Sequence, residues 1–436
     1  MKITNLIIIG ILLGVVHSGF AQIDVSMDRY ALIAELYDQS GEEVDMYGII
    51  TNEGATTASL TCRLDYDHPE SWLPPGICVG QSCYPSGIDF PLTLQPGAED
   101  TLHMTYYPFT DPGKGVYTFH VSGVGDPFSV EMEVLAGSSS ILVDDDGGDA
   151  YEVFITNALT SESQFLTWHQ AVEPLNSMDL TFIDRIIWIT GTETGEVLNE
   201  QEVGVLTAFL DNGGKAILSG ENILDGNAAA DFGRDMLGAE VSIHSVDSRT
   251  VQAITGEIFD ETFEFDITGG DGADNQSEPS GLNTVGSGRS ILRYDSGEVA
   301  TIRRIRVGGY RTMLCGFGLE AIADNEALST FLETVFQWFE STGIDNTGDI
   351  RPHELVMGVY PNPASRTIKL DMGEFSGSKI SIELTDLAGR RTAELYDGVW
   401  TGETLVIPPT DRGTYFVTVM SDQSVVSMPI VILGEK

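Results

Sequence analysis

A short apolar run that ends in two turn residues lies near the middle of the chain: Arg185-Ile186-Ile187-Trp188-Ile189-Thr190-Gly191. Its length and β-branched content predict a buried strand. A helix is predicted next, because Asn199 is a favoured N-cap and Glu202, three residues later, completes the capping-box pattern. Asn212-Gly213-Gly214 predicts the end of that helix. Lys215-Ala216-Ile217-Leu218 then predicts another buried strand, so this region alternates strand, helix and strand.

The alternation extends in both directions from this region. Buried strands are predicted upstream at Ile141-Leu142-Val143 and downstream at Arg311-Thr312-Met313-Leu314-Cys315. The last helix has an apolar face made of Leu328, Phe331, Leu332, Val335, Phe336 and Phe339. Strands that alternate with amphipathic helices predict a doubly wound α/β domain with a mainly parallel sheet over residues 138–342. Residues 241–309 are β-rich and glycine-rich instead, which predicts an insertion into this domain.

Both flanks of the α/β region lack this alternation. Residues 22–137 contain strand-length runs separated by turn residues, such as Met46-Tyr47-Gly48-Ile49-Ile50 before Asn52-Glu53-Gly54, and this predicts a β-sandwich. A polar linker is expected over residues 343–357. Residues 358–436 again alternate apolar and polar positions, which predicts a small β-sandwich. The chain is therefore expected to be multidomain.

The N-terminal residues 1–21 have the features of a secretory signal peptide. Lys2 supplies the positive start, an apolar run follows from Leu6 to Val16, and Gly19-Phe20-Ala21 offers small residues for cleavage. The run is shorter than the about 20 residues that span a bilayer, so a membrane anchor is the less favoured alternative. No Cys follows Ala21, so no lipid anchor is expected there.

The charge of the chain limits its partners. The formal net charge is -44 and the sequence pI is about 4.1. Nucleic-acid binding is not expected, because it depends on a Lys/Arg surface that displaces counterions. A hydrophobic content of 42% indicates a folded chain, so the acidity is interpreted as a means of solubility.

The four cysteines differ in their surroundings. Cys78 and Cys83 are close in sequence, and in an exported protein this spacing predicts a disulfide. A metal site is the alternative, but it needs further thiol or imidazole ligands and only His68 is near. Cys62 and Cys315 have no evident partner, and Cys315 is expected to be a small buried apolar residue.

Three loops are expected at the carboxyl ends of the predicted parallel strands, where open α/β sheets bind ligands. They are Asp144–Asp149, Thr190–Thr194 and Ser219–Asn222. The candidate ligand-binding residues in the second and third loops are Thr190, Ser219 and Glu221.

The first of these loops holds the candidate metal ligands, Asp144, Asp146 and Asp149. Clustered carboxylates on a glycine-containing turn are oxygen ligands suited to calcium, the one candidate cofactor. The spacing differs from an EF-hand, because no Glu closes the loop at the required distance. In the alternative interpretation one Asp caps the next helix and the others bind solvent or loop amides.

No catalytic residue is predicted. Ser219 follows a strand and either His169 or His244 would have to serve as its base, but no Gly-x-Ser-x-Gly turn surrounds it. A serine at a strand end is more often a turn or cap residue. The chain also lacks the His-Glu-x-x-His pattern of zinc proteases.

Three motifs close the chain in a fixed order: Val359-Tyr360-Pro361-Asn362-Pro363-Ala364, Leu384-Thr385-Asp386-Leu387-Ala388-Gly389-Arg390 and Arg412-Gly413-Thr414-Tyr415-Phe416-Val417. Together they resemble the C-terminal sorting domain, type A-like, of type IX secretion substrates. The motif residues are Tyr360, Pro361, Asn362, Pro363, Asp386, Gly389, Arg390, Gly413 and Tyr415. The resemblance implies export through the type IX translocon, with the sorting domain removed. It also implies that the cargo is secreted or joined to surface lipopolysaccharide.

A second resemblance concerns the α/β region. Val143-Asp144-Asp145-Asp146-Gly147-Gly148, Ser219-Gly220-Glu221-Asn222-Ile223 and Gly316–Ile322 are similar to a glutamine-amidotransferase-like domain. That family uses a Cys nucleophile on a strand-to-helix turn. Ser219-Gly220-Glu221 occupies that turn here, so the resemblance implies the fold without the activity. Residues 71–97 resemble part of an immunoglobulin-like module.

The sequence therefore predicts an exported, non-catalytic binding or adhesion protein whose ligand is an extracellular glycan or protein. The alternative is an extracellular hydrolase, peptidase-like or esterase-like, that acts through the strand-end loops.

Overall fold

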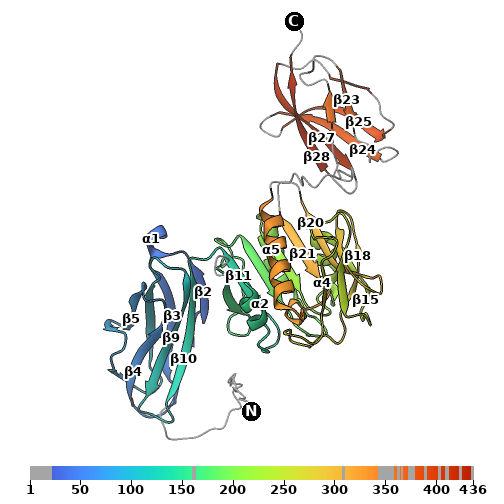
Figure 1. Ribbon diagram of the computed structural model, residues 1–436. Coiled ribbons are helices and arrows are strands. Elements are labelled where there is room, and N and C mark those ends of the chain that lie inside the picture. Colours follow the sequence, from blue (N-terminus) through green and yellow to red (C-terminus); the bar gives the residue numbers. More distant parts are fainter. Residues whose placement is uncertain are drawn as a thin grey trace. The chain divides into compact units, whose positions relative to one another are not determined.

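The computed structural model describes residues 22–159, 164–306, 310–341, 358–360, 364, 367–371, 379–386, 390–400, 404–407, 412–421 and 425–433. The chain divides into two compact units, Met1–Thr342 and Gly343–Lys436 (Figure 1). The predicted signal peptide and the predicted linker at 343–357 lie outside the described residues.

The first unit begins with two five-stranded sheets. One has the order β1 (Ile23–Met27), β3 (Val44–Asn52), β8 (Glu99–Tyr107), β5 (Leu73–Val79), β6 (Ser82–Pro85). The other has the order β2 (Ala31–Ala34), β10 (Phe128–Ala136), β9 (Gly113–Ser122), β4 (Ala58–Asp67), β7 (Phe90–Leu94), and the short helix α1 (Tyr37–Ser40) follows β2. Every second residue of β4 from Ala58 to Leu64 is buried, and residues of both sheets share one core. Period-two burial is the pattern of strands with one face on a core.

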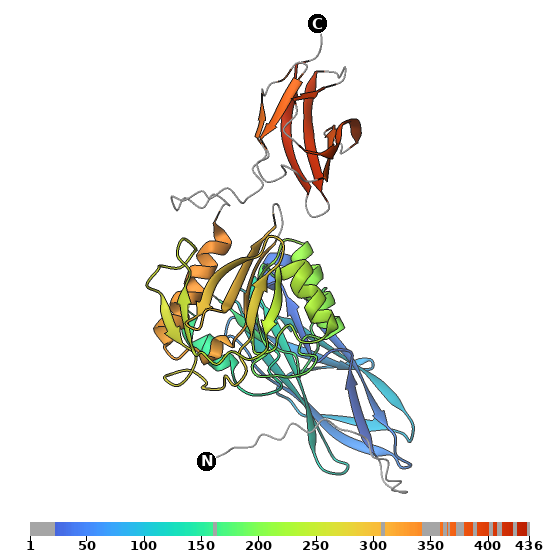
Figure 2. The ribbon, with the colours of Figure 1, turned by 90° about the vertical axis from the view of Figure 1, so that its right-hand side faces the viewer.

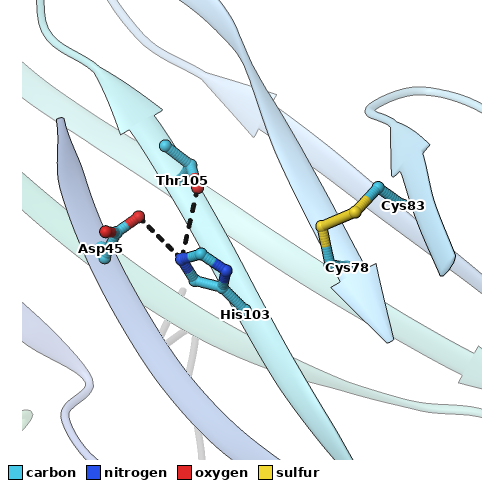
Figure 3. Close-up of a disulfide and its surroundings, with 5 residues drawn as sticks. All are labelled: Asp45, Cys78, Cys83, His103 and Thr105. Atoms are coloured by element: carbon cyan, nitrogen blue, oxygen red, sulfur yellow. Dashed lines mark hydrogen bonds and ion pairs between the residues drawn. A yellow bond between two sulfur atoms is a disulfide. The ribbon is translucent and has the colours of Figure 1, made fainter. Parts of the chain in front are cut away.

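The cysteines in this sandwich are of two kinds. Cys78 on β5 and Cys83 on β6 form a disulfide with sulfur atoms 1.99 Å apart (Figure 3). Cys62 is buried and free, as is Cys315 in the following sheet. Burial raises the pKa of the Cys315 thiol to about 12, so this residue acts as the small apolar side chain that its neighbours predict.

An eleven-stranded sheet follows, and five of its strands are parallel. Their order is β12 (Leu166–His169), β11 (Ser140–Asp144), β13 (Arg185–Ile189), β14 (Lys215–Ser219), β21 (Arg311–Cys315). The other strands are β20 (Val299–Ile305), β19 (Arg289–Tyr294), β16 (Thr250–Ala253), β17 (Glu264–Asp266), β15 (Ala239–Ile243) and β18 (Gly281–Thr284). Because β20 pairs antiparallel with β21, the strands of the expected insertion extend the same sheet. The sheet is therefore mixed, whereas the sequence predicted a mainly parallel one.

Helices contact both faces of the parallel strands. They are α2 (Glu152–Ala158), α3 (Glu200–Asp211), α4 (Asn227–Phe232) and α5 (Asn325–Glu340), together with a π-helix, η1 (Gly233–Leu237), and a 3-10 turn, η2 (Leu319–Ala321). Val143 packs in the same core as Leu206 of α3, while the adjacent Leu142 packs with Phe331 of α5. Figure 2 shows α5 and α3 on opposite sides of the strands. The predicted capping box at Asn199 and Glu202 is confirmed. Among the residues described, no helix has both the length and the apolar character that a bilayer span requires.

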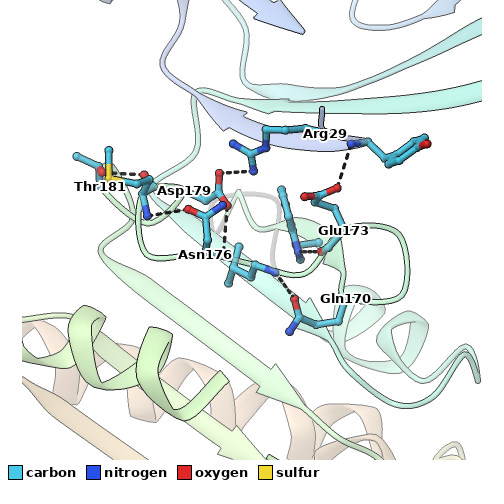
Figure 4. Close-up of polar contacts among 10 residues, drawn as sticks. Arg29, Gln170, Glu173, Asn176, Asp179 and Thr181 are labelled. Carbon is cyan, nitrogen blue, oxygen red and sulfur yellow. Dashed lines mark hydrogen bonds and ion pairs between the residues drawn. The ribbon is translucent and has the colours of Figure 1, made fainter. Parts of the chain in front are cut away.

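The sandwich and the eleven-stranded sheet share buried contacts within the first unit. Ala31 and Leu135 of the sandwich belong to the same core cluster as Leu180 beside the sheet. Arg29 Nη2 lies 2.6 Å from Asp179 Oδ1, whose side chain is 2% exposed (Figure 4). Such a buried charge needs its partner. The segment before β13 therefore joins the two folds through both apolar packing and an ion pair.

The C-terminal unit has two sheets. One contains β22 (Gly358–Tyr360), β23 (Thr367–Asp371) and β26 (Thr404–Val406). The other has the order β25 (Arg391–Val399), β24 (Lys379–Thr385), β27 (Gly413–Ser421), β28 (Val425–Ile432). Apolar residues from both sheets form a single core, including Ile368, Leu405, Ile382, Val417 and Ile430. The period-two pattern of this region accounts for that core.

Two of the predicted motif residues in this unit, Asp386 and Arg390, are bonded to each other. Asp386 accepts hydrogen bonds from the backbone and the guanidinium of Arg390, each at 2.9 Å, and its own N–H donates to the Arg390 carbonyl. This arrangement ties the residue after β24 to the residue before β25. Gly413 and Tyr415 lie on β27, and Tyr360 ends β22. Pro361, Asn362, Pro363 and Gly389 lie outside the described residues.

Candidate functional site

The strand order of the sheet reverses at β11. It passes from β11 to β12 on one side and then to β13 on the other, so β11 lies between its two successors. Crevices at such points, beyond the carboxyl ends of the strands, are where open α/β sheets bind ligands. Asp144 is the last residue of β11, which makes the loop after it the first place to look.

Asp144 and His169 face each other across this edge, because parallel register pairs them. His169 Nδ1 lies 2.7 Å from Asp144 Oδ2, and this hydrogen bond raises the pKa of His169. Asp144 is 8% exposed. Its second oxygen, Oδ1, is buried and has no hydrogen-bond partner.

The two aspartates that follow have separate partners. Asp146 accepts hydrogen bonds from the backbone N–H groups of Gly148, at 2.9 Å, and Tyr151, at 3.1 Å. Burial, reinforced by the charge of Asp144, raises the pKa of Asp146 to about 7. Asp145 accepts from Trp188 Nε1 at 2.9 Å, and burial raises its pKa to about 8.

A third carboxylate joins the first two from the next helix. One oxygen each from Asp144, Asp146 and Glu152 lies within 4.8 Å of the others. Asp149, the third predicted ligand, is exposed and is not part of this group. Sequence reasoning missed Glu152, although an acidic residue in the first turn of the helix after an aspartate-rich loop was an available signal.

The ligand candidates at the other strand ends are buried. Thr190 and Ser219 are 0% exposed, and Glu221 is 1% exposed. The Ser219 hydroxyl donates to the Phe317 carbonyl at 3.0 Å and accepts from the Leu319 N–H at 2.7 Å. Both capacities of that hydroxyl are thus used within the protein.

Residues from the insertion cover these strand ends. Glu221 accepts hydrogen bonds from the Ser277 hydroxyl at 3.1 Å and from the Glu278 N–H at 2.6 Å. Asn275 donates to the fully buried Glu320 at 2.9 Å. The carboxylates here hold the 275–278 segment in place.

The two histidines considered as bases have carboxylate partners. His169 is bonded to Asp144, and His244, 68% exposed in its side chain, lies 3.1 Å from Asp225. Within the described ranges, neither histidine shares a hydrogen bond with Ser219. The residues brought together here thus resemble an ion-binding group more than a nucleophile–base pair.

A separate hollow of about 440 Å³ lies along α4 and β15. Asp225, Arg234, Glu240 and His244 contribute its polar lining. It contains none of the three clustered carboxylates. We favour the β11 edge as the candidate site, because buried polar groups converge there.

Comparisons with known proteins identify one part of the chain. Residues 358–433 match the family described as "Secretion system C-terminal sorting domain". No curated protein matches the sequence.

Three solved structures illustrate a similarity at a low level. The N-terminal domain of PorA is 16% identical with a TM-score of 0.22, and the match covers 26% of this chain and 99% of that one. The CooA pilin subunit from enterotoxigenic Escherichia coli is 8% identical with a TM-score of 0.21, covering 26% and 96%. A family 123 glycoside hydrolase from Clostridium perfringens is 8% identical with a TM-score of 0.20, covering 41% and 39%. Nothing about activity follows from similarities at this level.

The family match is confined to the C-terminal unit and confirms its predicted role. It does not extend to residues 138–342, so the amidotransferase-like resemblance gains no support from it. The chain carries a type IX C-terminal sorting domain, which engages the type IX secretion machinery and marks the chain as a protein exported across the outer membrane to the cell surface or the medium.

Proposed function

We propose that residues 22–342 are a binding or adhesion cargo without a catalytic centre, and that the ligand is an extracellular glycan. The observation that carries the non-catalytic part of the proposal is the state of Ser219, the candidate nucleophile at a strand end. Its hydroxyl is buried and occupied at both donor and acceptor positions by backbone groups. A nucleophile needs an adjacent base and access to substrate, and the described contacts of Ser219 provide neither.

We also propose that residues 138–342 form a doubly wound α/β domain of the amidotransferase-like type. The strand order β12-β11-β13-β14-β21 supports this, since it corresponds to the 2-1-3-4-5 order of one doubly wound class. The helices support it as well, because α3 packs in one core of the sheet while α2 and α5 pack in the other. After export, the cargo is either released or joined to surface lipopolysaccharide.

The outer face of the first sheet offers a surface for a glycan. Tyr47 on β3 is 50% exposed and stacks on His103 of β8 at 4.6 Å between ring centroids and 8° between planes. Asp45 Oδ1 lies 2.9 Å from His103 Nε2, with Thr105 beside them (Figure 3). A flat aromatic face next to carboxylate and hydroxyl groups suits a sugar ring, which has an apolar face and a rim of hydroxyls.

Charge narrows the class of glycan. A net charge of -44 repels polyanions such as sulfated or uronic-acid chains. The surface formed by Tyr47, His103 and Asp45 carries a carboxylate that can accept hydrogen bonds from the neutral hydroxyls of a sugar. We therefore expect a neutral glycan.

A glycan and protein array probed with the exported protein tests this proposal. Tyr47→Ala is expected to weaken glycan binding about fivefold, because a stacked aromatic contributes on the order of 1 kcal/mol. Ser219→Ala is expected to leave binding unchanged. Tyr66→Ala is the matched control, since Tyr66 is also an exposed tyrosine stacked on a histidine, His68, but on the other sheet.

Three outcomes would count against the proposal. Equal losses of glycan binding in the Tyr47 and Tyr66 variants would show that Tyr47 does not form the binding surface. Hits confined to proteins would replace the glycan by a protein ligand. A hydrolytic activity that disappears in Ser219→Ala would favour the alternative, an extracellular peptidase-like or esterase-like hydrolase.

A further inference from the structure

We propose that Asp144, Asp146 and Glu152 bind a divalent cation of the hard, oxygen-preferring class, with calcium as the ion. The proposal is independent of the glycan surface, which lies on the sandwich. It also changes the ligand set that the sequence predicts, because Glu152 replaces Asp149.

The first argument is the state of the carboxylate oxygens. Asp144 Oδ1 and Glu152 Oε2 are both buried and both lack a hydrogen-bond partner. The Asp144 side chain is only 9% exposed. A buried carboxylate oxygen without a partner is costly, so an unpartnered pair in one cluster points to a missing positive ligand.

The second argument is that the surrounding groups orient the ligands. His169 holds Oδ2 of Asp144, which leaves Oδ1 for the ion. The backbone N–H groups of Gly148 and Tyr151 each bind one oxygen of Asp146, and every carboxylate oxygen keeps a further lone pair. Partners that fix first-shell ligands in this way are typical of metal sites.

The balance of charge supports the same conclusion. Asp145, Glu193 and Glu202 also lie near this edge, since the charges of all three act on one another. Within the described part of the chain, no Lys or Arg forms an ion pair with Asp144, Asp146 or Glu152. Among the described residues, His169 is the one basic side chain that forms a hydrogen bond with the cluster, while the charge of Lys114 acts on Glu152 without an ion pair between them.

The ligand chemistry selects the ion. All three groups offer hard oxygen atoms, which suit calcium or magnesium more than zinc or copper. Oxygens up to 4.8 Å apart fit around calcium, because Ca–O distances of about 2.3–2.6 Å place opposite ligands roughly 5 Å apart. Magnesium requires shorter distances and near-octahedral geometry. Water or backbone carbonyls would complete the shell.

The experiment uses the exported protein after treatment with a chelator. Equilibrium dialysis should show one calcium ion per chain, and saturating calcium should raise the melting temperature by roughly 5 °C. Asp146→Asn and Glu152→Gln should each abolish the calcium-dependent rise. Asp149→Asn should retain it in full, and it is the matched control because it removes a carboxylate from the same loop.

Several results would overturn the proposal. An absence of saturable calcium binding by the wild-type protein would do so, and this measurement does not depend on any variant folding. Loss of the rise in Asp149→Asn with its retention in Glu152→Gln would reinstate the ligand set predicted from sequence. A rise with magnesium alone would refute the choice of ion.

Discussion

Removing residues 358–436 is expected to leave the protein in the periplasm, with export reduced to background. The N-terminal signal crosses only the inner membrane, whereas the sorting domain is what the type IX machinery recognises. Fractionation of cells that express full-length and truncated chains, with an antiserum against residues 22–137, measures this directly. Truncated protein in the medium at the wild-type level would refute the role of the C-terminal unit.

A control must separate failed sorting from failed folding. The two units are separately compact, so the truncated protein should keep the melting temperature of the cargo. Asp386→Ala in the full-length chain is a milder variant, because it removes the carboxylate that ties the end of β24 to Arg390 before β25. Reduced export in that variant would tie the defect to the sorting domain.

Glu320→Gln is expected to stabilise the protein at about pH 8 by up to about 3 kcal/mol, while leaving stability near pH 4 almost unchanged. Burial raises the pKa of Glu320 from 4.5 to about 7, and one of its oxygens has no hydrogen-bond partner. Between these two pKa values the folded chain keeps a proton that the unfolded chain releases. The stability of the wild type therefore falls as pH rises through this window, and the neutral Gln removes that loss.

Chemical unfolding followed by tryptophan fluorescence from about pH 5 to about pH 8 measures the slope for both chains. Glu333→Gln is the control, because Glu333 is exposed on α5 and should give the wild-type slope. Burial also raises the pKa values of Asp145, Asp146 and Glu221, so part of the slope, with the same sign, should remain in Glu320→Gln. Parallel slopes for the wild type and Glu320→Gln would contradict the assigned pKa.

The elements that the sequence predicted best depend on local signals. The helix from Glu200 to Asp211 is specified by its own cap at Asn199. The β-sandwich strands are specified by an alternation of apolar and polar residues, which the structure shows as period-two burial. The pairing of β14 with β21 has no such signal, because it joins Lys215–Ser219 to Arg311–Cys315 across the whole insertion. For that reason the insertion was predicted as a separate feature, although β20 forms a hairpin with β21 and continues the sheet.

The same distinction holds at the candidate site. Asp144 and Asp146 were identified because they follow a predicted strand directly. Their contact with His169 depends on the register between β11 and β12, and their contact with Glu152 on how α2 turns back over the loop. The burial of Ser219 and Glu221 depends on a segment far along the chain, residues 275–278, which no local pattern places over them.

The most direct test of the central claim follows the fate of the ligand. Glycans that the exported wild-type protein binds on the array would be incubated with it in solution and then analysed by mass spectrometry. Binding without catalysis predicts that each glycan is recovered intact, whatever the incubation time. Cleaved glycan that accumulates beyond one molecule per protein chain, and that disappears in Ser219→Ala, would contradict it.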